Sequence, residues 1–189
     1  MKERKKMKKI KITLEGTSPL LMNRYNVERE LKRMKGIRNL NKTYDSVEEA
    51  EQSAYWTTSG KKELCIPSNC LYASLLGASS FHKIGKRSAK SILAGSIRIL
   101  PDEIRLNTAK YEIDTRPVVI ARQRVLKSRA KLNSWKATFE IAYNENLVTS
   151  PTVIKEILSE AGERVGLLDF RPQKGGWFGA FKITEFEPQ

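Results

Sequence analysis

Hydrophobic and polar residues alternate along three segments of the chain, and this pattern is typical of β-strands with one buried face. Residues 9–16 (KIKITLEG) alternate isoleucine and leucine with polar residues and end at a glycine. Residues 135–143 (WKATFEIAY) and residues 178–186 (FGAFKITEF) repeat the alternation in the last third of the chain. Shorter extended segments are expected at residues 64–67, 96–100, 103–106 and 112–120.

Two other segments have the spacing of core-facing helices. Residues 67–69 (PSN) provide a helix start before a run of apolar residues, which predicts a helix over about residues 68–81. Residues 150–165 begin with a serine and a proline and then carry apolar residues at helical spacing. A shorter helix is expected from Ser46 to about Trp56, because Ser46 and Glu49 form a capping-box pattern.

The order of these elements is strand, helix, strands, helix, strand. This order predicts an α+β fold with a ferredoxin-like, RNA-recognition-motif-like core, in which two helices cover one face of a mostly antiparallel sheet. A chain of 189 residues fits one domain. We expect three additions to its core, which are a basic tail at 1–8, an insertion at 23–63 and a basic hairpin or loop insertion at 98–134.

The excess of positive charge along the chain indicates a negatively charged partner. The chain has 35 Lys and Arg against 21 Asp and Glu, a net charge of +14, which favours nucleic acid as the partner and an anionic membrane surface as the second candidate. No run of 18 apolar residues is present, and no apolar run follows the basic N-terminus. We therefore expect a cytoplasmic protein without a membrane span, whose N-terminal residues form a solvated tail or a phosphate-binding arm.

Positive charge is concentrated in two stretches. Residues 116–136 contain seven basic residues and no acid, and residues 82–98 contain five and no acid, so we expect both on the surface. The first stretch is the better basic patch and is predicted to form a protruding hairpin or loop. The candidate phosphate contacts are Arg116, Arg122, Arg124, Lys127, Arg129 and Lys131, together with Lys86 and Arg87.

A glycine-containing segment near the C-terminus combines three features of nucleic-acid-binding loops. It reads GLLDFRPQKGGWFG over residues 166–179. Its glycines allow a close approach of backbones, Arg supplies a planar fork for phosphate, and an aromatic ring can stack on a base. The candidate contacts are Arg171, Lys174, Gly175, Gly176 and Trp177. The alternative is a structural turn that places Trp177 and Phe178 in the core.

Three motifs together resemble the RAMP superfamily, especially the backbone subunits of CRISPR effector complexes. They are the opening KIKITLEGTSPLL, the helix start IPSNCLYASLLGA, and the glycine-containing loop before the final strand. The resemblance implies a ferredoxin-like core whose helix start and glycine loop contact the nucleic-acid backbone, and assembly side by side along the strand as a homo-oligomer or filament. The positions it carries over are Pro67, Ser68, Asn69, Gly175, Gly176 and Gly179. The C-terminal loop also resembles small prophage-encoded proteins, so a phage single-strand-binding role is equally open.

Catalytic and metal-binding motifs give little support for an enzyme. The sequence has no GxxxxGK[ST] loop, HExxH motif or serine-hydrolase elbow, and Cys65 and Cys70 lack the second ligand pair of a zinc site. The candidate carboxylates are scattered singly, so neither a metal nor a cofactor is expected. We interpret Asp45 as part of a helix start, and we expect Asp114 and Asp169 to orient the neighbouring Arg116 and Arg171.

The sequence thus favours a non-enzymatic protein that binds single-stranded RNA or DNA along its phosphate backbone, with splayed bases on an open sheet. One alternative is a metal-independent RAMP-type endoribonuclease, in which His82, the only histidine, removes a proton from a ribose 2′-hydroxyl. The other is a basic scaffold that binds an acidic protein.

Overall fold

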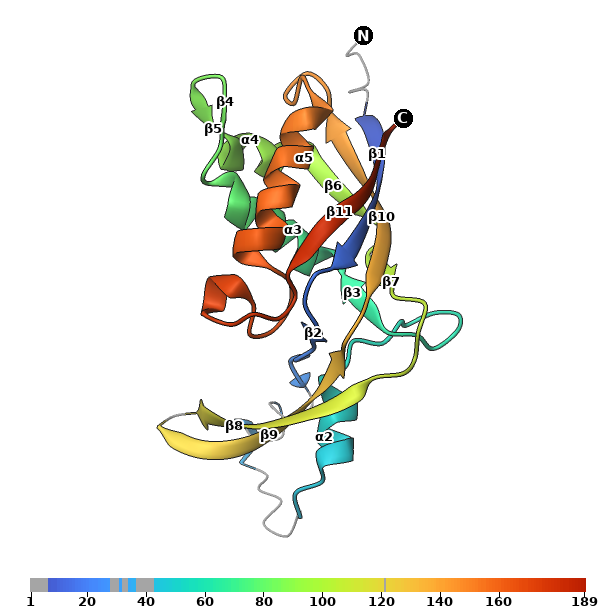
Figure 1. Cartoon of the computed structure of the whole chain (residues 1–189), viewed down its shortest axis with the longest axis vertical. Helices are drawn as coiled ribbons and strands as arrows, with labels where there is room; N and C mark the ends of the chain where they lie inside the picture. Colours follow the sequence, from blue (N-terminus) through green and yellow to red (C-terminus); the bar gives the residue numbers. More distant parts are fainter. Residues whose placement is uncertain (1–6, 28–30, 32–33, 37–42, 121) are drawn as a thin grey trace.

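The computed structural model describes residues 7–27, 31, 34–36, 43–120 and 122–189. Its centre is a four-stranded antiparallel sheet with the strand order β11-β1-β10-β6 (Figure 1). The strands are β1 (Met7–Gly16), β6 (Ile97–Leu100), β10 (Lys136–Asn144) and β11 (Phe181–Pro188). β1 begins at Met7, so the last two residues of the predicted tail belong to the sheet, and residues 1–6 lie outside the described residues.

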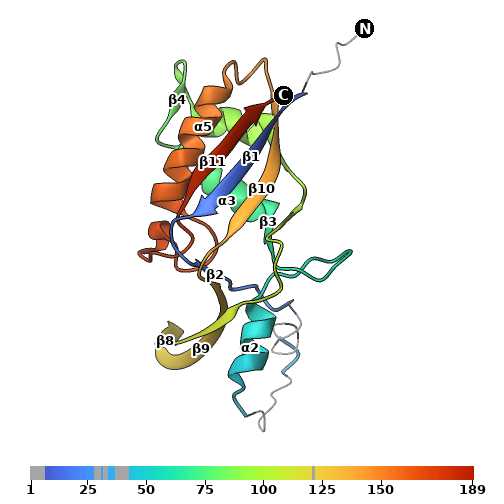
Figure 2. The same ribbon diagram turned by 45° about the vertical axis from the view of Figure 1, so that its right-hand side comes forward.

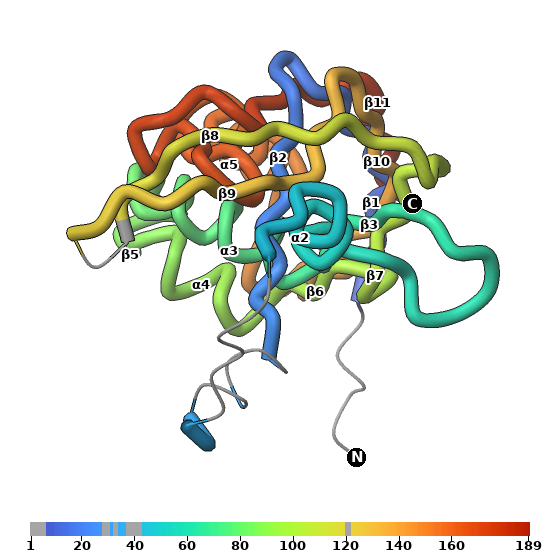
Figure 3. The backbone as a smooth tube through the Cα atoms, turned by 90° about the horizontal axis from the view of Figure 1, so that it is seen from below, coloured from blue at the N-terminus to red at the C-terminus, as the bar shows by residue number. Residues whose placement is uncertain are grey.

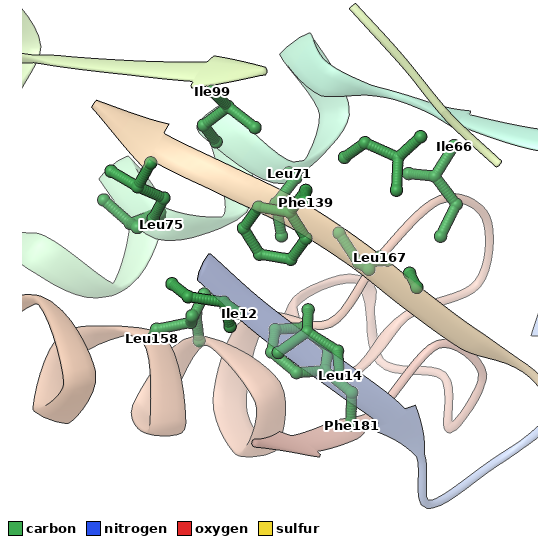
Figure 4. Close-up of a cluster of buried hydrophobic side chains, with 14 of the residues drawn as sticks. Ile12, Leu14, Ile66, Leu71, Leu75, Ile99, Phe139, Leu158, Leu167 and Phe181 are labelled. Carbon is green, nitrogen blue, oxygen red and sulfur yellow. The ribbon is translucent and has the colours of Figure 1, made fainter. Parts of the chain in front are cut away.

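Two helices cover one face of this sheet, α3 (Ser68–Ser79) and α5 (Pro151–Glu160). Figure 4 shows how side chains of the sheet meet those of the helices in the core, and its labelled residues include Ile12 and Leu14 of β1, Phe139 of β10, Leu71 and Leu75 of α3, and Leu158 of α5. In chain order the core elements are β1, α3, β6, β10, α5 and β11. The prediction of an α+β fold with a mostly antiparallel sheet is confirmed.

Local sequence accounts for the start of α5 and for its close packing. The Ser150 hydroxyl accepts a hydrogen bond from the Thr152 N–H, and Pro151 occupies the first turn, as the sequence predicts. α5 continues into a π-helical turn (Ala161–Val165) in which Gly162 lies against β11. A Cβ atom at Gly162 would lie 2.1 Å from the Phe181 carbonyl oxygen, so only glycine permits this approach.

Residues 82–98 are only partly a surface segment. A small hairpin of β4 (Lys83–Ile84) and β5 (Arg87–Ser88) is followed by α4 (Ala89–Ser96), whose Ala89 and Leu93 are fully buried. The expectation that the whole stretch stays on the surface is wrong, because residues four apart on a helix share one face and these two reach the core. The sequence gives only a weak helical signal here, because these two apolar residues lie among several lysines and arginines.

A second group of elements lies beyond one end of the main sheet, in the lower half of Figures 1 and 2. A three-stranded sheet in the order β2-β9-β8 consists of β2 (Leu20–Leu21), β8 (Glu112–Ile120) and β9 (Gln123–Leu132). β3 (Cys65–Pro67) pairs with β7 (Glu103–Arg105). The insertion was expected at 98–134, but residues 98–100 belong to the core strand β6. The protruding hairpin within this range consists of β8 and β9.

α2 (Ser46–Ser53) packs beside β9, as Figure 3 shows from below. The helix begins differently from the predicted capping box. Asp45 is the cap, and its carboxylate accepts hydrogen bonds from the N–H groups of Val47 and Glu48. The structural interpretation of Asp45 is confirmed and the Ser46–Glu49 box is wrong. Parts of the predicted insertion at 23–63, namely residues 28–30, 32–33 and 37–42, lie outside the described residues.

A membrane-spanning helix would need a long apolar stretch. Within the described part of the chain, none of the helices has the length and apolar character to cross a bilayer.

Candidate nucleic-acid interface

The β8–β9 hairpin has two faces with different surroundings. Residues directly opposite in an antiparallel pair share a face, so Thr115 and Ser128 belong to one face and Asp114 and Arg129 to the other. Along the edge of β9 that faces away from β8, the Ser53 hydroxyl accepts a hydrogen bond from the Ala130 N–H at 2.8 Å. The Glu49 carboxylate of α2 accepts one from the Ser128 N–H at 2.7 Å. The base of the hairpin is therefore fixed on α2.

The second face of the hairpin meets the C-terminal loop through charged side chains. Asp114 Oδ1 lies 2.8 Å from Arg116 Nε, and the Arg129 Nη1 atom donates to Asp169 Oδ2 at 2.8 Å. Arg129 Nη2 lies 3.8 Å from Asp114 Oδ1. We call these four residues the clasp, and it joins the base of the hairpin to residues 166–179. The prediction that Asp114 orients Arg116 is confirmed, whereas Asp169 pairs with Arg129 and not with Arg171.

The loop of residues 166–179 folds back on itself. The Leu167 N–H donates to the Gly179 carbonyl and the Phe178 N–H donates to the Phe170 carbonyl. A Cβ atom at Gly176 would lie 1.8 Å from the Phe170 oxygen, and one at Gly179 would lie 2.0 Å from the Leu167 oxygen. These two glycines are therefore required for the close approach of the loop's own backbone, and Gly175 ends the 3-10 turn Pro172–Lys174 at a φ of 75°.

The folded loop presents one aromatic ring to solvent. Phe178 is 2% exposed, while Trp177 is 57% exposed and stacks on Phe178 with ring centroids 5.6 Å apart. Phe170 supports Trp177 edge-on at 5.3 Å. The Arg116 guanidinium of the hairpin lies 5.6 Å from the Trp177 ring centre and 5.1 Å from that of Phe178. The alternative prediction, a structural turn with Trp177 and Phe178 in the core, is thus correct for Phe178 and wrong for Trp177.

The arrangement of Arg116 and Trp177 suits one nucleotide unit. Asp114 contacts the Nε atom of Arg116. The two Nη atoms of Arg116 have no hydrogen-bond partner among the described residues. An arginine held in this way offers a fork of N–H donors to a phosphate. The exposed Trp177 ring beside it provides a flat apolar surface on which a base can stack. We call this pair the junction, because it joins the β8–β9 hairpin to the C-terminal loop of residues 166–179.

The remaining hairpin cations extend away from the junction. Lys127 lies opposite Arg116 on the same face, Arg124 lies opposite Val119, and Arg122 is in the turn with a φ of 67°. Arg122 and Arg124 are exposed and Lys127 is partly exposed. Arg129 belongs to the predicted patch but is only 6% exposed, so its guanidinium is not a surface group. Lys131 pairs with Glu112 at 2.9 Å.

The C-terminal loop lies against α3, the helix whose start carries the other predicted contacts. The Ser74 hydroxyl of α3 donates to the Gly166 carbonyl at 2.9 Å. Burial raises the pKa of the Cys70 thiol, and the nearby Arg171 guanidinium partly offsets this rise. Arg171 itself donates to the Leu168 carbonyl and to Gln173 within the loop.

The other contacts predicted for the loop and the helix start are on the surface. Lys174 and Asn69 are exposed, and Ser68 is partly exposed with its N–H bound to the Asp102 carbonyl. Lys86 and Arg87 are exposed on the β4–β5 hairpin, which is a different element from the β8–β9 hairpin of the junction.

The open face of the main sheet does not resemble a base-stacking platform. The strand register places on it, from the described residues of the four strands, alternating Thr, Lys and Glu side chains and no aromatic ring. Lys9 pairs with Glu140, and Glu15 lies between Lys136 and Lys182. The expectation that this face binds splayed bases is therefore not supported, because stacking needs exposed aromatic rings and the charges here neutralise one another.

His82 and the cysteines have structural surroundings. His82 Nε2 contacts the Glu160 carboxylate at the end of α5, and Arg164 donates to the other oxygen of Glu160 at 2.6 Å. Burial raises the pKa of Cys65 to about 11, so its thiol stays protonated at neutral pH. Within the described residues, no three His, Cys, Asp or Glu side chains form a group that could hold a metal ion.

Sequence comparisons give no family. No family model matches this chain. No curated protein matches it. Among the solved structures, a chain described as "CRISPR RNA-guided surveillance complex" matches with a TM-score of 0.41 and 6% sequence identity. The match covers 93% of this chain and 66% of that chain, so this chain spans just under two thirds of its neighbour's length. Similarity at this level assigns neither a family nor an activity.

Proposed function

We propose that this protein binds single-stranded nucleic acid, RNA or single-stranded DNA, along its phosphate backbone and without catalysis. The observation that carries the proposal is the exposed Trp177 ring held beside the Arg116 guanidinium at the hairpin–loop junction. An exposed tryptophan next to an oriented arginine matches the two faces of a nucleotide, its base and its phosphate. The hairpin extends this site with Lys127 on the face of Arg116, with Arg122 in the turn, and with Arg124 near the tip on the other face.

The charge distribution supports a polyanionic partner over an acidic protein partner. Between Thr115 and Phe139 the chain has no acidic residue, whereas the main sheet pairs its lysines with glutamates. Cations along a projecting hairpin that have no ion-pair partner among the described residues can each replace a counterion on a phosphate, and this gain is independent of base sequence. We therefore expect little sequence preference.

The site favours single strands over duplexes. A base can stack on Trp177 only when its own neighbour in the strand leaves one of its faces open, as happens in single strands. The β-α-β-β-α-β order of the core supports a ferredoxin-like assignment, and we propose that copies assemble side by side along the strand. Such binding is consistent with a role in a CRISPR effector complex and with a role in a phage single-strand-binding system.

Replacement of Trp177 tests the proposal at its centre. We expect Trp177→Ala to lower single-strand affinity by about 1–3 kcal/mol, because the base loses its stacking surface. The melting temperature should change little, since the ring is largely exposed. Fluorescence anisotropy with labelled oligonucleotides and thermal melting on the same preparation measure the two quantities.

Trp177→Phe is the matched control, because it keeps an aromatic face and should retain most of the affinity. Full affinity in Trp177→Ala, or a large loss of stability with normal affinity per folded molecule, would contradict the stacking role.

A second candidate function is metal-independent RNA cleavage, and one contact favours it. The Glu160 carboxylate contacts His82, and a carboxylate partner is a common way of orienting a histidine base. The same contact clamps the ends of α3 and α5. We expect His82→Ala to bind single strands like the wild type, and we expect the wild type to leave RNA intact in EDTA. Cleavage that disappears in His82→Ala and on a 2′-deoxy substrate would establish the enzyme instead.

A further inference from the structure

The clasp places a buried arginine between two carboxylates from different parts of the chain. Arg129 of β9 is 6% exposed, and its two Nη atoms face Asp169 and Asp114, respectively. Its Nε atom is buried without a hydrogen-bond partner among the described residues. The guanidinium is therefore held by one hydrogen bond, from Nη1 to Asp169, and by a longer ion pair from Nη2 to Asp114. A cation in this position pairs with the buried Asp114, which also contacts Arg116, and with the partly exposed Asp169.

One carboxylate of the clasp also fixes the loop backbone. Asp169 accepts the Phe170 N–H on Oδ1 and Arg129 on Oδ2, and its own N–H donates to the Leu21 carbonyl. The residues on either side, Leu168 and Phe170, have φ angles of 60° and 46°. Non-glycine residues adopt such angles at a cost and keep them only where surrounding contacts enforce them. The Arg129–Asp169 pair is such a contact, and Phe170 is the residue that supports Trp177 edge-on.

The other carboxylate of the clasp orients the binding arginine. Asp114 lies opposite Arg129 in the hairpin and engages the Nε atom of Arg116. Arg129 thus contacts the anchors of both halves of the junction, the loop that carries Trp177 and the carboxylate that directs Arg116. Its own guanidinium is buried and does not reach a ligand in solvent.

We infer that Arg129 is a positioning residue that holds the hairpin and the C-terminal loop in the one arrangement in which Arg116 and Trp177 act on the same nucleotide. This inference rests on the proposed function for its effect on binding. The clasp itself is a property of the free protein. Without Arg129 the loop and the hairpin still fold, but they move independently. The Trp177 ring and the Arg116 guanidinium are then no longer held next to each other.

The first arm of the test uses free protein. Hydrogen exchange followed by mass spectrometry compares the wild type with Arg129→Met, which keeps an extended apolar stem but removes the charge. Amides of residues 166–179 should exchange about tenfold faster in the variant, while those of β1 and α3 should keep their protection. Arg98→Met is the matched control, because Arg98 is an exposed arginine on β6, in the main sheet and not in the sheet of the clasp. Unchanged exchange of the loop in Arg129→Met would overturn the clasp.

The second arm separates positioning from a general loss of stability. Affinity for a labelled oligonucleotide of thymidine or uridine is measured well below the melting temperature for Arg129→Met, Trp177→Ala and the double variant. If Arg129 acts through the junction, Trp177→Ala lowers affinity in the wild type but changes it less than about twofold in Arg129→Met. A Trp177→Ala effect of equal size in both backgrounds would refute the positioning role. Absence of oligonucleotide binding by the wild type would refute the proposed function alone, because the exchange arm still decides on the clasp.

Discussion

A protein in which Arg122, Arg124 and Lys127 are all replaced by glutamine is expected to bind single strands at least about tenfold more weakly at low salt. Each cation that contacts a phosphate releases a condensed counterion and contributes about 0.7 to the slope of log affinity against log salt on single strands. Removal of three contacts should therefore flatten the slope by about two units. Glutamine keeps much of the aliphatic stem and tolerates the positive φ at Arg122 better than a β-branched residue does.

The measurement is fluorescence anisotropy with a labelled single-stranded oligonucleotide over a series of salt concentrations. A matched control replaces Lys11, Arg98 and Lys182, which are exposed on the open face of the main sheet, and changes the net charge by the same amount. If the hairpin carries the backbone contacts, the control keeps its slope. Equal losses in the two variants would mean that net charge alone attracts the strand, and an unchanged slope in the hairpin variant would place the site elsewhere.

Phe178→Ala is expected to produce the largest loss of stability among the junction variants. The ring is 2% exposed and contacts both Phe170 and Trp177, and truncation of a buried phenylalanine costs about 3–5 kcal/mol. For a domain of this size the melting temperature should fall by about 6–20 °C. Affinity per folded molecule should also fall, because Trp177 loses the ring on which it stacks.

Thermal melting measures this effect, with Phe81→Ala as the matched control. Phe81 is 61% exposed and contacts Arg164, so its truncation should cost less than about 1 kcal/mol. A Phe178→Ala protein that melts like the wild type would show that the loop is not packed as described. The two variants thus have different expected profiles, since Trp177→Ala lowers affinity with little change in melting temperature and Phe178→Ala lowers both.

The sequence by itself determined the main elements of the core. The alternation in residues 9–16 and 135–143 reproduces β1 and β10, and the helix starts at Ser68 and Pro151 agree with α3 and α5. These signals are local, because an amphipathic strand or helix must place its apolar residues at a fixed spacing to bury them. A short apolar pair gives a weaker signal, and the burial of α4 was missed for that reason. The Asp45 cap was interpreted correctly because its role depends on the next three residues alone.

Only the tertiary structure decided which charged residues are surface groups and which are internal. Arg129 and Arg124 look alike in the sequence, yet one is buried in the clasp and the other is exposed on the hairpin. Arg129 meets Asp169 across 40 positions of the chain, and neither residue carries a local sign of the other. The hairpin register and the path of the loop bring them together, and both depend on packing against α2, β2 and the main sheet. Long-range contacts of this kind leave no periodic pattern, so the junction of Arg116 with Trp177 became visible only in the folded chain.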